Sequence, residues 1–239
     1  MTITERRSLS YEENNHQRSI VSEPKEENTV KVLLVNGSPN QAGCTYTALS
    51  EVAGALKEEG VKTDFLWIGK KPVNGCIGCR KCAELGKCVF DDMVNQFAAK
   101  AGEYDGFVFG SPVYYAGMNG SLKAFMDRLF FSASHSDPHP FLFKPAAAVV
   151  SARRAGTTSA LDQLNKYFLN CQMIVISSRY WNMVHGNTPE EVRQDAEGLQ
   201  TMRALGRNMA WFLKLKEAGE KAGVPLPRQE ERIATNFIR

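Results

Sequence analysis

Apolar and polar residues alternate along the chain in blocks that predict a strand followed by a helix, five times in succession. The strands are expected where short apolar runs are bounded by polar or turn-forming residues, as is typical of buried strands. These runs are Val30–Asn36, Val61–Ile68, Gly106–Gly110, Ala146–Ser151 and Met173–Ser177.

The segments between these runs place apolar residues at the i, i+3, i+4 and i+7 spacing of amphipathic helices. Leu49, Val52, Ala53 and Leu56 give the first example, and Gly60 marks its end. The other predicted helices start at Asp91 or Asp92, run through Leu122–Leu129 and Ala160–Leu169, and extend from Thr188 to about Ala218, with Gly198 and Gly206 as candidate bends.

This alternation predicts an α/β protein, a three-layer sandwich in which a parallel sheet lies between two layers of helices. Ligands of such sheets bind beyond the carboxyl ends of the strands. The loops expected at that edge are Gly37–Cys44, Gly69–Val89, Gly110–Gly120 and Ser151–Thr158.

One domain, residues 30–222, contains all of these elements. Residues 1–29 hold six acidic and four basic residues and few large apolar ones, which is typical of a flexible arm. Residues 223–239 are expected to form an irregular C-terminal tail.

Composition narrows the class of protein. Hydrophobic residues make up 43% of the 239, which excludes wholesale disorder. The net charge is only +3, so neither nucleic acid nor an anionic membrane is an expected partner. The N-terminus lacks the apolar core of a signal peptide, and no apolar stretch approaches the roughly 18 residues of a membrane span. We therefore expect a cytoplasmic protein.

Loop Gly37–Cys44 joins a strand to the start of a helix, where backbone N–H groups and the helix dipole favour an anion. Ser38, Asn40, Thr45 and Thr47 can all donate to a phosphate. A nucleotide-hydrolase loop would need a lysine, and a dinucleotide-binding turn would need a third glycine; the loop has neither. The loop therefore favours a monophosphate, with a plain capped turn as the alternative.

Loop Ser111–Gly117 follows the third strand and contains Tyr114 and Tyr115. Flat aromatic side chains beside exposed amides suit a planar conjugated ring. Because this loop and the phosphate loop share one edge of the sheet, together they fit flavin mononucleotide (FMN). The alternative is a structural turn with a buried tyrosine.

Two segments resemble the NADPH-dependent FMN reductase family and its iron–sulfur flavoprotein branch. They are Gly37-Ser38-Pro39 before a Thr-rich helix start, and Gly110-Ser-Pro-Val-Tyr-Tyr115 followed by Leu122-Lys-Ala-Phe-Met-Asp-Arg128. The resemblance extends over about residues 30 to 215. It implies a flavodoxin-like fold with a five-stranded parallel sheet in the order 2-1-3-4-5, bound FMN, and a homodimer or a dimer of dimers.

The resemblance also implies which residues contact FMN. Ser38, Asn40, Cys44 and Thr45 would surround its phosphate. Its ring would be bordered by Pro112, Val113, Tyr114, Tyr115, Ala116 and Gly117, and on the far side by Ser151, Ala152, Arg153, Gly156 and Thr157. Tyr115 is the candidate for proton transfer, and Arg153 is the candidate partner of reduced, anionic flavin or of the NADPH phosphate.

Two residues of the phosphate loop depart from the family pattern. Asn40 stands where many relatives have a basic residue, and Cys44 stands where many have asparagine. The phosphate is therefore expected to rest mainly on backbone amides.

Four cysteines lie within one short segment: Cys76, Cys79, Cys82 and Cys88. A compact set of thiolates suits a [4Fe–4S] cluster, and the spacing resembles the motif of the iron–sulfur flavoproteins. Zinc sites usually separate two cysteine pairs by a longer insert, so this spacing suits zinc less well. The third alternative is a set of metal-free thiols, whose pKa values the neighbouring Lys81 and Lys87 would lower.

The predicted function is that of an FMN-dependent NAD(P)H oxidoreductase. Hydride would pass from the nicotinamide to FMN, and the electrons would then pass to a small acceptor such as a quinone, flavin, azo or nitro compound. One alternative is an iron–sulfur flavoprotein that carries electrons with a ferredoxin-like partner. The other is a redox or metal sensor built on the cysteine loop.

Overall fold

The computed structural model describes residues 29–231 together with residues 233, 235 and 237. The arm predicted for residues 1–29 lies outside the described residues, apart from Thr29. Residues 224–231 follow the last helix without helix or strand.

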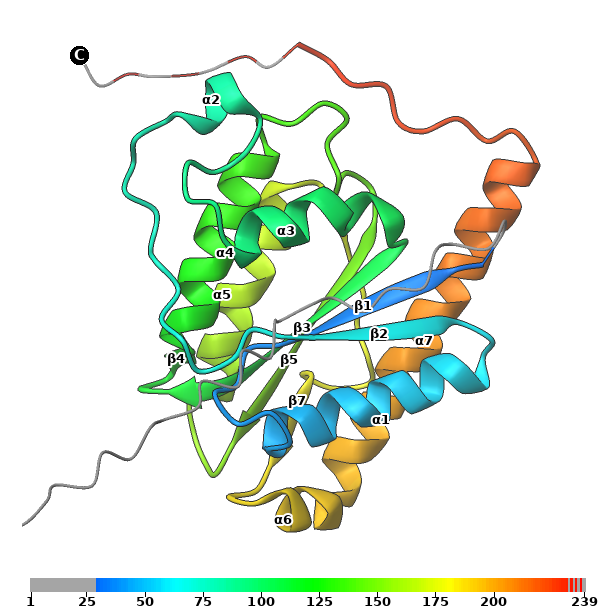
Figure 1. Ribbon diagram of the computed structural model, residues 1–239. Helices are drawn as coiled ribbons and strands as arrows, with labels where there is room; N and C mark the ends of the chain where they lie inside the picture. The colour runs from blue at the N-terminus through cyan, green and yellow to red at the C-terminus, as the bar shows by residue number, and fades with distance from the viewer. Residues whose placement is uncertain (1–28, 232, 234, 236, 238–239) are drawn as a thin grey trace, which may run out of the picture.

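A twisted sheet forms the middle layer, and helices lie on both of its sides (Figure 1). The strands are β1 (Lys31–Asn36), β2 (Lys62–Trp67), β3 (Gly106–Tyr114), β4 (Gly117–Met118), β5 (Pro145–Ala152), β6 (Ile174–Val175) and β7 (Met183–His185). The helices are α1 (Cys44–Glu58), α2 (Cys82–Leu85), α3 (Met93–Lys100), the 3-10 helix η1 (Ala101–Glu103), α4 (Gly120–Ala133), α5 (Thr157–Asn170), α6 (Pro189–Gln194) and α7 (Ala196–Lys221).

The order of the parallel strands is β2-β1-β3-β5-β6, which confirms the predicted order 2-1-3-4-5. The fifth position differs from the prediction because two short strands share it. β6 pairs with the start of β5, and β7 pairs with its end at Val150–Ala152. The chain leaves the sheet after Ile176 and returns at Met183.

The central strands are mostly apolar because both of their faces are covered. Every residue of β1 is buried, whereas the edge strand β2 keeps Lys62 exposed and Asp64 half-buried. This difference is expected between a central parallel strand and an edge strand.

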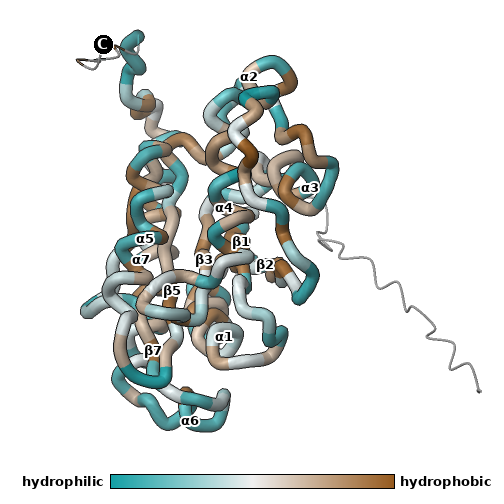
Figure 2. The backbone as a smooth tube through the Cα atoms, turned by 90° about the vertical axis from the view of Figure 1, so that its left-hand side faces the viewer, coloured by the Kyte–Doolittle hydropathy of each residue, from teal (hydrophilic) through white to brown (hydrophobic). Residues whose placement is uncertain are grey.

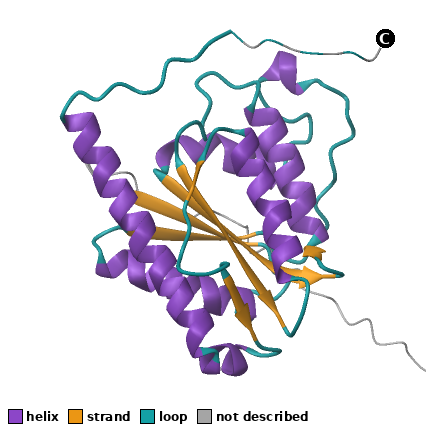
Figure 3. Ribbon diagram, turned by 180° about the vertical axis from the view of Figure 1, so that it is seen from behind, coloured by secondary structure: helices purple, strands orange, loops and turns teal. Residues whose placement is uncertain are grey.

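Two hydrophobic cores lie on opposite faces of the sheet. The core beneath α3, α4 and α5 is aromatic: the ring of Phe97 packs against Phe107, Phe125 and Phe141 at centroid distances of 5.3 to 6.4 Å. The core beneath α1 and α7 is aliphatic and centres on residues such as Leu49. Figure 3 shows these two groups of helices from behind, and Figure 2 shows hydrophilic colour gathered at outer parts such as α6.

β3 continues beyond the predicted end at Gly110 as far as Tyr114, and the chain then folds back as β4. Tyr115 and Ala116 form the turn, with φ of 49° and 57°. Two consecutive positive φ values match the turns that join tightly paired antiparallel strands. The segment predicted as an aromatic loop is therefore the tip of a β-hairpin.

The C-terminal helix breaks at Asp195 rather than at the predicted bends. The Asp195 carboxylate accepts from Gly198 N at 2.9 Å and from His185 N at 2.7 Å, so it ends α6, caps α7 and ties both to β7. Gly206 instead lies at a close helix contact, where an added Cβ would be 2.7 Å from Val52 O of α1. Within residues 29–231, none of the helices combines the length and the apolar character that a membrane crossing requires.

Candidate functional site

Three loops meet at the carboxyl edge of the sheet, as the sequence predicts. The loop after β1 touches β3, since Gly37 N donates to Gly110 O at 2.8 Å. It also reaches the end of β5, where the hydroxyls of Thr45 and Ser151 lie 2.8 Å apart. The loop after β5 touches the β3–β4 hairpin closely, because a Cβ on Gly156 would be 2.7 Å from the Cα of Ala116. The residues predicted for phosphate and ring are thereby brought together.

The loop after β1 is held in shape by its own polar groups. Asn36, at the buried end of β1, accepts from Ser38 N and donates to Gln41 O, both at 3.0 Å. Ser38 Oγ accepts from Asn40 N at 3.1 Å, and Trp67 Nε1 donates to Ser38 O at 2.8 Å. Ser38 is therefore buried, and its hydroxyl and carbonyl oxygens already accept hydrogen bonds. The Asn40 side chain, by contrast, is exposed at the rim of the loop.

Two helices that begin at this edge lack side-chain caps. Gly43 precedes α1 and Gly156 precedes α5, and neither start has a side-chain hydrogen bond in the part of the chain that the structure describes. By contrast, α3, α4 and α7 are capped by Asp92, Asn119 and Asp195. The first amides of α1 and α5 thus remain available to an anion, and the helix dipoles favour it. This arrangement fits a phosphate.

Hydrogen bonds to neighbouring residues hold the hairpin in place, and its aromatic tip is exposed. Ser111 Oγ accepts from Asn119 N at 2.9 Å, and Met118 N donates to Gln163 Oε1 at 3.1 Å. At the tip, Tyr114 is about half exposed and Tyr115 is fully exposed. A rigid hairpin that presents free aromatic side chains next to an anion cradle fits a planar ring joined to a phosphate.

The loop after β5 carries the remaining predicted residues. Arg153 is exposed, whereas Thr157 is buried at the start of α5. The ring of His185 lies on the same rim, with Nε2 3.1 Å from Arg154 O. The loop thus places a cationic side chain at the far side of the predicted ring site.

Cys44 stands at the first position of α1, where its Sγ lies 3.7 Å from Gly186 O. Burial raises the pKa of the Cys44 thiol, and the charges of Glu191 and Glu190 raise it further. The thiol therefore stays neutral and does not repel a phosphate at this helix start.

The four clustered cysteines line one pocket. Cys82 is buried, Cys88 is half-buried, and Cys76 and Cys79 are exposed. The side chains around them include Phe90, Arg128 and Phe131, and no carboxylate is among the described residues that line the pocket. Sulfur donors beside a guanidinium, without oxygen ligands, are the donor chemistry of an iron–sulfur centre. The residue types that line the pocket therefore match the ligands of such a group, although no three of the described side chains are arranged as a ready metal-binding group.

One expectation about these thiols is wrong. Lys81 and Lys87 do not lower the pKa of Cys82, contrary to the prediction: burial raises the pKa of this thiol, and the neighbouring thiols raise it further. Lys81 Nζ instead faces Glu84 at 3.9 Å on the exposed side of α2. Among the described residues, no three His, Cys, Asp or Glu side chains form a group that could hold a metal ion.

The cysteine pocket does not lie at the carboxyl edge of the sheet, although the loop that carries it starts there. Figure 1 shows the chain leaving β2 near the hairpin and running to α2 at the other end of the molecule. Arg128, which lines the pocket, lies eight positions after Gly120, or about 12 Å along α4. The two candidate sites are therefore at different ends of α4.

Several residues that shape these sites were missed by sequence reasoning. Asn36 and Asn119 could have been found from their positions, because one ends a strand before Gly-Ser-Pro and the other precedes an amphipathic helix. Gln163 carries no such signal. Arg128 lies within the motif that resembles the FMN reductases. Its position next to the apolar face of the predicted helix could have indicated that its side chain is buried.

Comparisons with known proteins agree with this geometry. Residues 30–188 match the family described as NADPH-dependent FMN reductase. An iron–sulfur flavoprotein of Methanocaldococcus jannaschii is 35% identical over 197 residues, covering 78% of this chain and 98% of the relative. An iron–sulfur flavoprotein of Archaeoglobus fulgidus is 25% identical over 196 residues, with the same coverage of 78% and 98%.

Solved structures show the same fold. RosB with a bound 8-demethyl-8-formylriboflavin-5'-phosphate intermediate aligns with a TM-score of 0.62 at 12% identity, over 87% of this chain and 92% of that chain. A WrbA-like flavodoxin from Agrobacterium tumefaciens aligns with a TM-score of 0.54 at 16% identity, over 78% and 99%. At these identities the likeness concerns the fold alone, which is flavodoxin-like as predicted.

Proposed function

This chain belongs to the NADPH-dependent FMN reductase family, and we propose that it takes electrons from NADPH or NADH and passes them to a small acceptor. Membership of the family makes it an FMN-dependent oxidoreductase. The acceptor classes that we propose are a quinone, a free flavin, an azo compound or a nitro compound.

The observation that carries the proposal is the pair of uncapped helix starts at Gly43 and Gly156, with the hydroxyls of Thr45 and Ser151 between their loops. We place the FMN phosphate there, because amides and hydroxyls can satisfy its oxygens without a cation. RosB, which shares this fold, was solved with a bound flavin-phosphate intermediate.

The ring of FMN would lie along the hairpin at Pro112–Gly117, where Tyr114 presents an aromatic face. Bound FMN supplies the hydride chemistry of such enzymes. Arg153 would then balance the negative charge of the reduced ring or of the NADPH phosphate. Tyr115, fully exposed at the turn, would hold a proton at its phenol oxygen beside the acceptor.

We propose that the four cysteines hold a [4Fe–4S] cluster. Their convergence on one pocket supports this, as do the names of the iron–sulfur flavoprotein relatives. Such a group would supply one-electron exchange, which suits a protein donor of the ferredoxin class. An electron carrier is therefore the second candidate function.

The visible spectrum of protein purified without oxygen, measured together with iron and FMN content, tests both candidates. A flavin spectrum with oxidation of NADPH or NADH in the presence of one of the acceptor classes supports the reductase. A flavin spectrum with bound iron, rapid exchange with reduced ferredoxin and no pyridine nucleotide oxidation supports the carrier. Protein that is colourless and fails to bind added FMN contradicts both.

Two further parts of the proposal concern the protein's surroundings. We propose a homodimer or a dimer of dimers, which light scattering of the purified protein would test. We also propose a cytoplasmic location, where the clustered thiols would stay reduced until they bind iron.

A further inference from the structure

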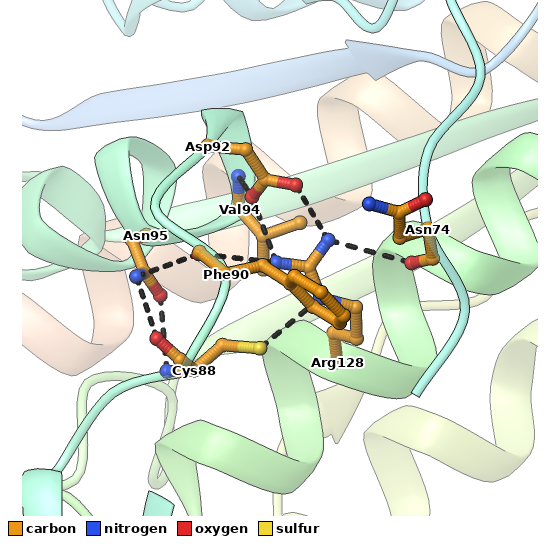
Figure 4. A network of polar contacts seen from close by, with 7 residues as sticks. All are labelled: Asn74, Cys88, Phe90, Asp92, Val94, Asn95 and Arg128. Atoms are coloured by element: carbon orange, nitrogen blue, oxygen red, sulfur yellow. Dashed lines mark hydrogen bonds and ion pairs between the residues drawn. The ribbon is translucent and has the colours of Figure 1, made fainter. Parts of the chain in front are cut away.

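Arg128 is a buried cation at the centre of the cysteine segment. Its Nε donates to Cys88 Sγ at 3.1 Å, and its two terminal nitrogens donate to the Asp92 carboxylate at 2.6 and 2.8 Å (Figure 4). The remaining N–H groups reach the carbonyls of Asn74 at 3.4 Å and Phe90 at 3.3 Å. All of the guanidinium nitrogens therefore donate hydrogen bonds, and every acceptor lies within residues 74–92, which include the four cysteines.

The orientation of the guanidinium is fixed from two sides. Asp92 is itself fixed as the cap of α3, since its Oδ1 accepts from Val94 N at 3.0 Å. The ring of Phe90 packs on the guanidinium at 4.9 Å. The guanidinium of arginine keeps its charge in proteins, and here it is paired with the Asp92 carboxylate. A permanent cation is therefore aimed at one particular sulfur.

Cys88 is also held through its backbone, by a side chain of α3. Asn95 Oδ1 accepts from Cys88 N at 3.0 Å, and its Nδ2 donates to Cys88 O at 2.8 Å and to Phe90 O at 2.9 Å. Cys76 and Cys79, by contrast, are exposed. Among the four thiols, Cys88 is therefore the one that two packed helices, α3 and α4, position in advance.

We infer that Arg128 sets the reduction potential of the cluster by donating an N–H···S hydrogen bond to Cys88 and by placing a buried positive charge beside that ligand. The inference rests on the cluster in the proposed function. Reduction adds one electron, supplied by reduced FMN or by a ferredoxin-class protein, and no bond forms or breaks. The added negative charge spreads onto the sulfurs, so a cationic donor to one sulfur favours the reduced form.

Arg128 thus acts through Cys88 as a positioning residue. A purely structural ion pair with Asp92 would fold the segment equally well but would leave the potential unchanged. The potential is therefore the measurement that separates the two roles.

Two variants isolate the role of Arg128. Arg128→Lys keeps a cation but lacks the Nε donor and the two-pronged pairing with Asp92. Arg128→Met combined with Asp92→Asn removes both charges together and keeps an acceptor to cap α3. The matched control is Arg203→Met with Glu51→Gln, which removes an ion pair between α7 and α1, away from the thiols.

The experiment is a potentiometric titration of the holoprotein without oxygen, followed by the visible and electron paramagnetic resonance signals of the cluster. At the wild-type midpoint we expect the Met/Asn variant to show an about tenfold lower ratio of reduced to oxidised cluster, which is about 59 mV for one electron. Arg128→Lys should shift in the same direction by less, and the control should match the wild type. Bound FMN, at the other end of α4, reports that each variant has folded.

Three results would overturn the inference. Equal midpoints in iron-loaded variants would leave Arg128 a purely structural role, with the proposed cluster intact. If the double variant holds no iron, an unshifted Arg128→Lys midpoint would lead to the same conclusion. A wild-type protein that binds no iron after reconstitution with iron and sulfide would remove the proposed cluster itself.

Discussion

At the scale of single residues, the candidate flavin site depends on small polar side chains that meet across the fold. Thr45 and Ser151 are 106 positions apart, yet their hydroxyls are 2.8 Å from each other. Both side chains are buried, so few other hydrogen-bonding partners lie within reach of their hydroxyls. Their shared position between two uncapped helix starts makes them the residues on which phosphate binding should depend most.

Thr45→Val tests that dependence, because valine keeps the shape and removes the hydroxyl. Loss of a hydrogen bond to a charged group costs about 1.5–3 kcal/mol, so the Kd for FMN should rise roughly 10- to 100-fold. Quenching of flavin fluorescence measures it. The control is Thr201→Val: Thr201 is equally buried in α7, and its hydroxyl donates to Glu197 O. Equal affinities in both variants would contradict the phosphate site.

Cys171 gives a prediction about pH. It is 5% exposed, and burial raises its pKa to about 11, from about 9 for an exposed thiol. Above pH 9 the thiol loses its proton in the unfolded protein but keeps it in the folded protein, which favours unfolding. The contribution of the thiol to stability is therefore fully present below pH 9 and is lost as the pH rises to 11. The stability advantage of wild type over Cys171→Ala should shrink by about 1–2 kcal/mol over that range, after allowance for solvent screening. Urea unfolding from pH 8 to 11 measures it; a constant difference would argue against the raised pKa.

At the scale of elements, the close packing of α1 against α7 fixes the layer on one face of the sheet. Gly206 permits that approach, because a Cβ there would lie 2.7 Å from Val52 O and 2.8 Å from the Cβ of Ala55. α1 in turn carries the first amides of the phosphate loop. A change in this helix contact can therefore reach the site through the position of α1.

Gly206→Ala should destabilise the protein although alanine is the better helix former. Alanine gains about 1 kcal/mol in helix propensity, but forcing the helices apart costs about 1–3 kcal/mol, so we expect a net loss of up to about 2 kcal/mol. Gly54→Ala is the matched control, since a Cβ on exposed Gly54 meets nothing within 4 Å. That change should stabilise by about 0.5–1 kcal/mol. Urea denaturation compares them, and a stabilised Gly206→Ala protein would show that the contact is loose.

In the molecule as a whole, α4 extends from the candidate flavin site to the cysteine pocket. Its start lies beside the hairpin at the carboxyl edge, and its second half carries Arg128 to the cysteine pocket. FMN would contact the loops after β1, β3 and β5 and so connect most of the sheet. The cysteine segment, in contrast, is tied chiefly to α3 and α4.

FMN should therefore stabilise the protein globally. Free FMN at 100 times its Kd should add about 2.7 kcal/mol to the free energy of unfolding, because it binds the folded chain alone. Thermal unfolding with increasing FMN measures this, and the Thr45→Val variant should need proportionally more FMN for the same shift. Riboflavin, which lacks the phosphate, should stabilise much less; equal effects of the two would place the phosphate outside the pocket of amides.

The amino-acid sequence alone predicts the succession of strands and helices and a parallel sheet covered on both faces, because apolar periodicity reflects which side of each element is buried. The order of the strands was implied by the resemblance to the FMN reductases. The sequence also identified the loops of the candidate flavin site, since parallel strands deliver their carboxyl ends to one edge. The spacing of the four cysteines likewise indicated one shared pocket.

The contacts between distant positions are seen only in the folded structure. There, β3 extends to Tyr114 because β4 pairs back on it, and the fifth strand is split around the excursion after Ile176. The structure shows that the cysteine pocket lies away from the carboxyl edge of the sheet, where the sequence predicts it. It also shows that Arg128 contacts Cys88, 40 positions earlier in the chain. Periodicity records that a residue is buried but not which partner it meets, and that partner depends on how separate elements pack together.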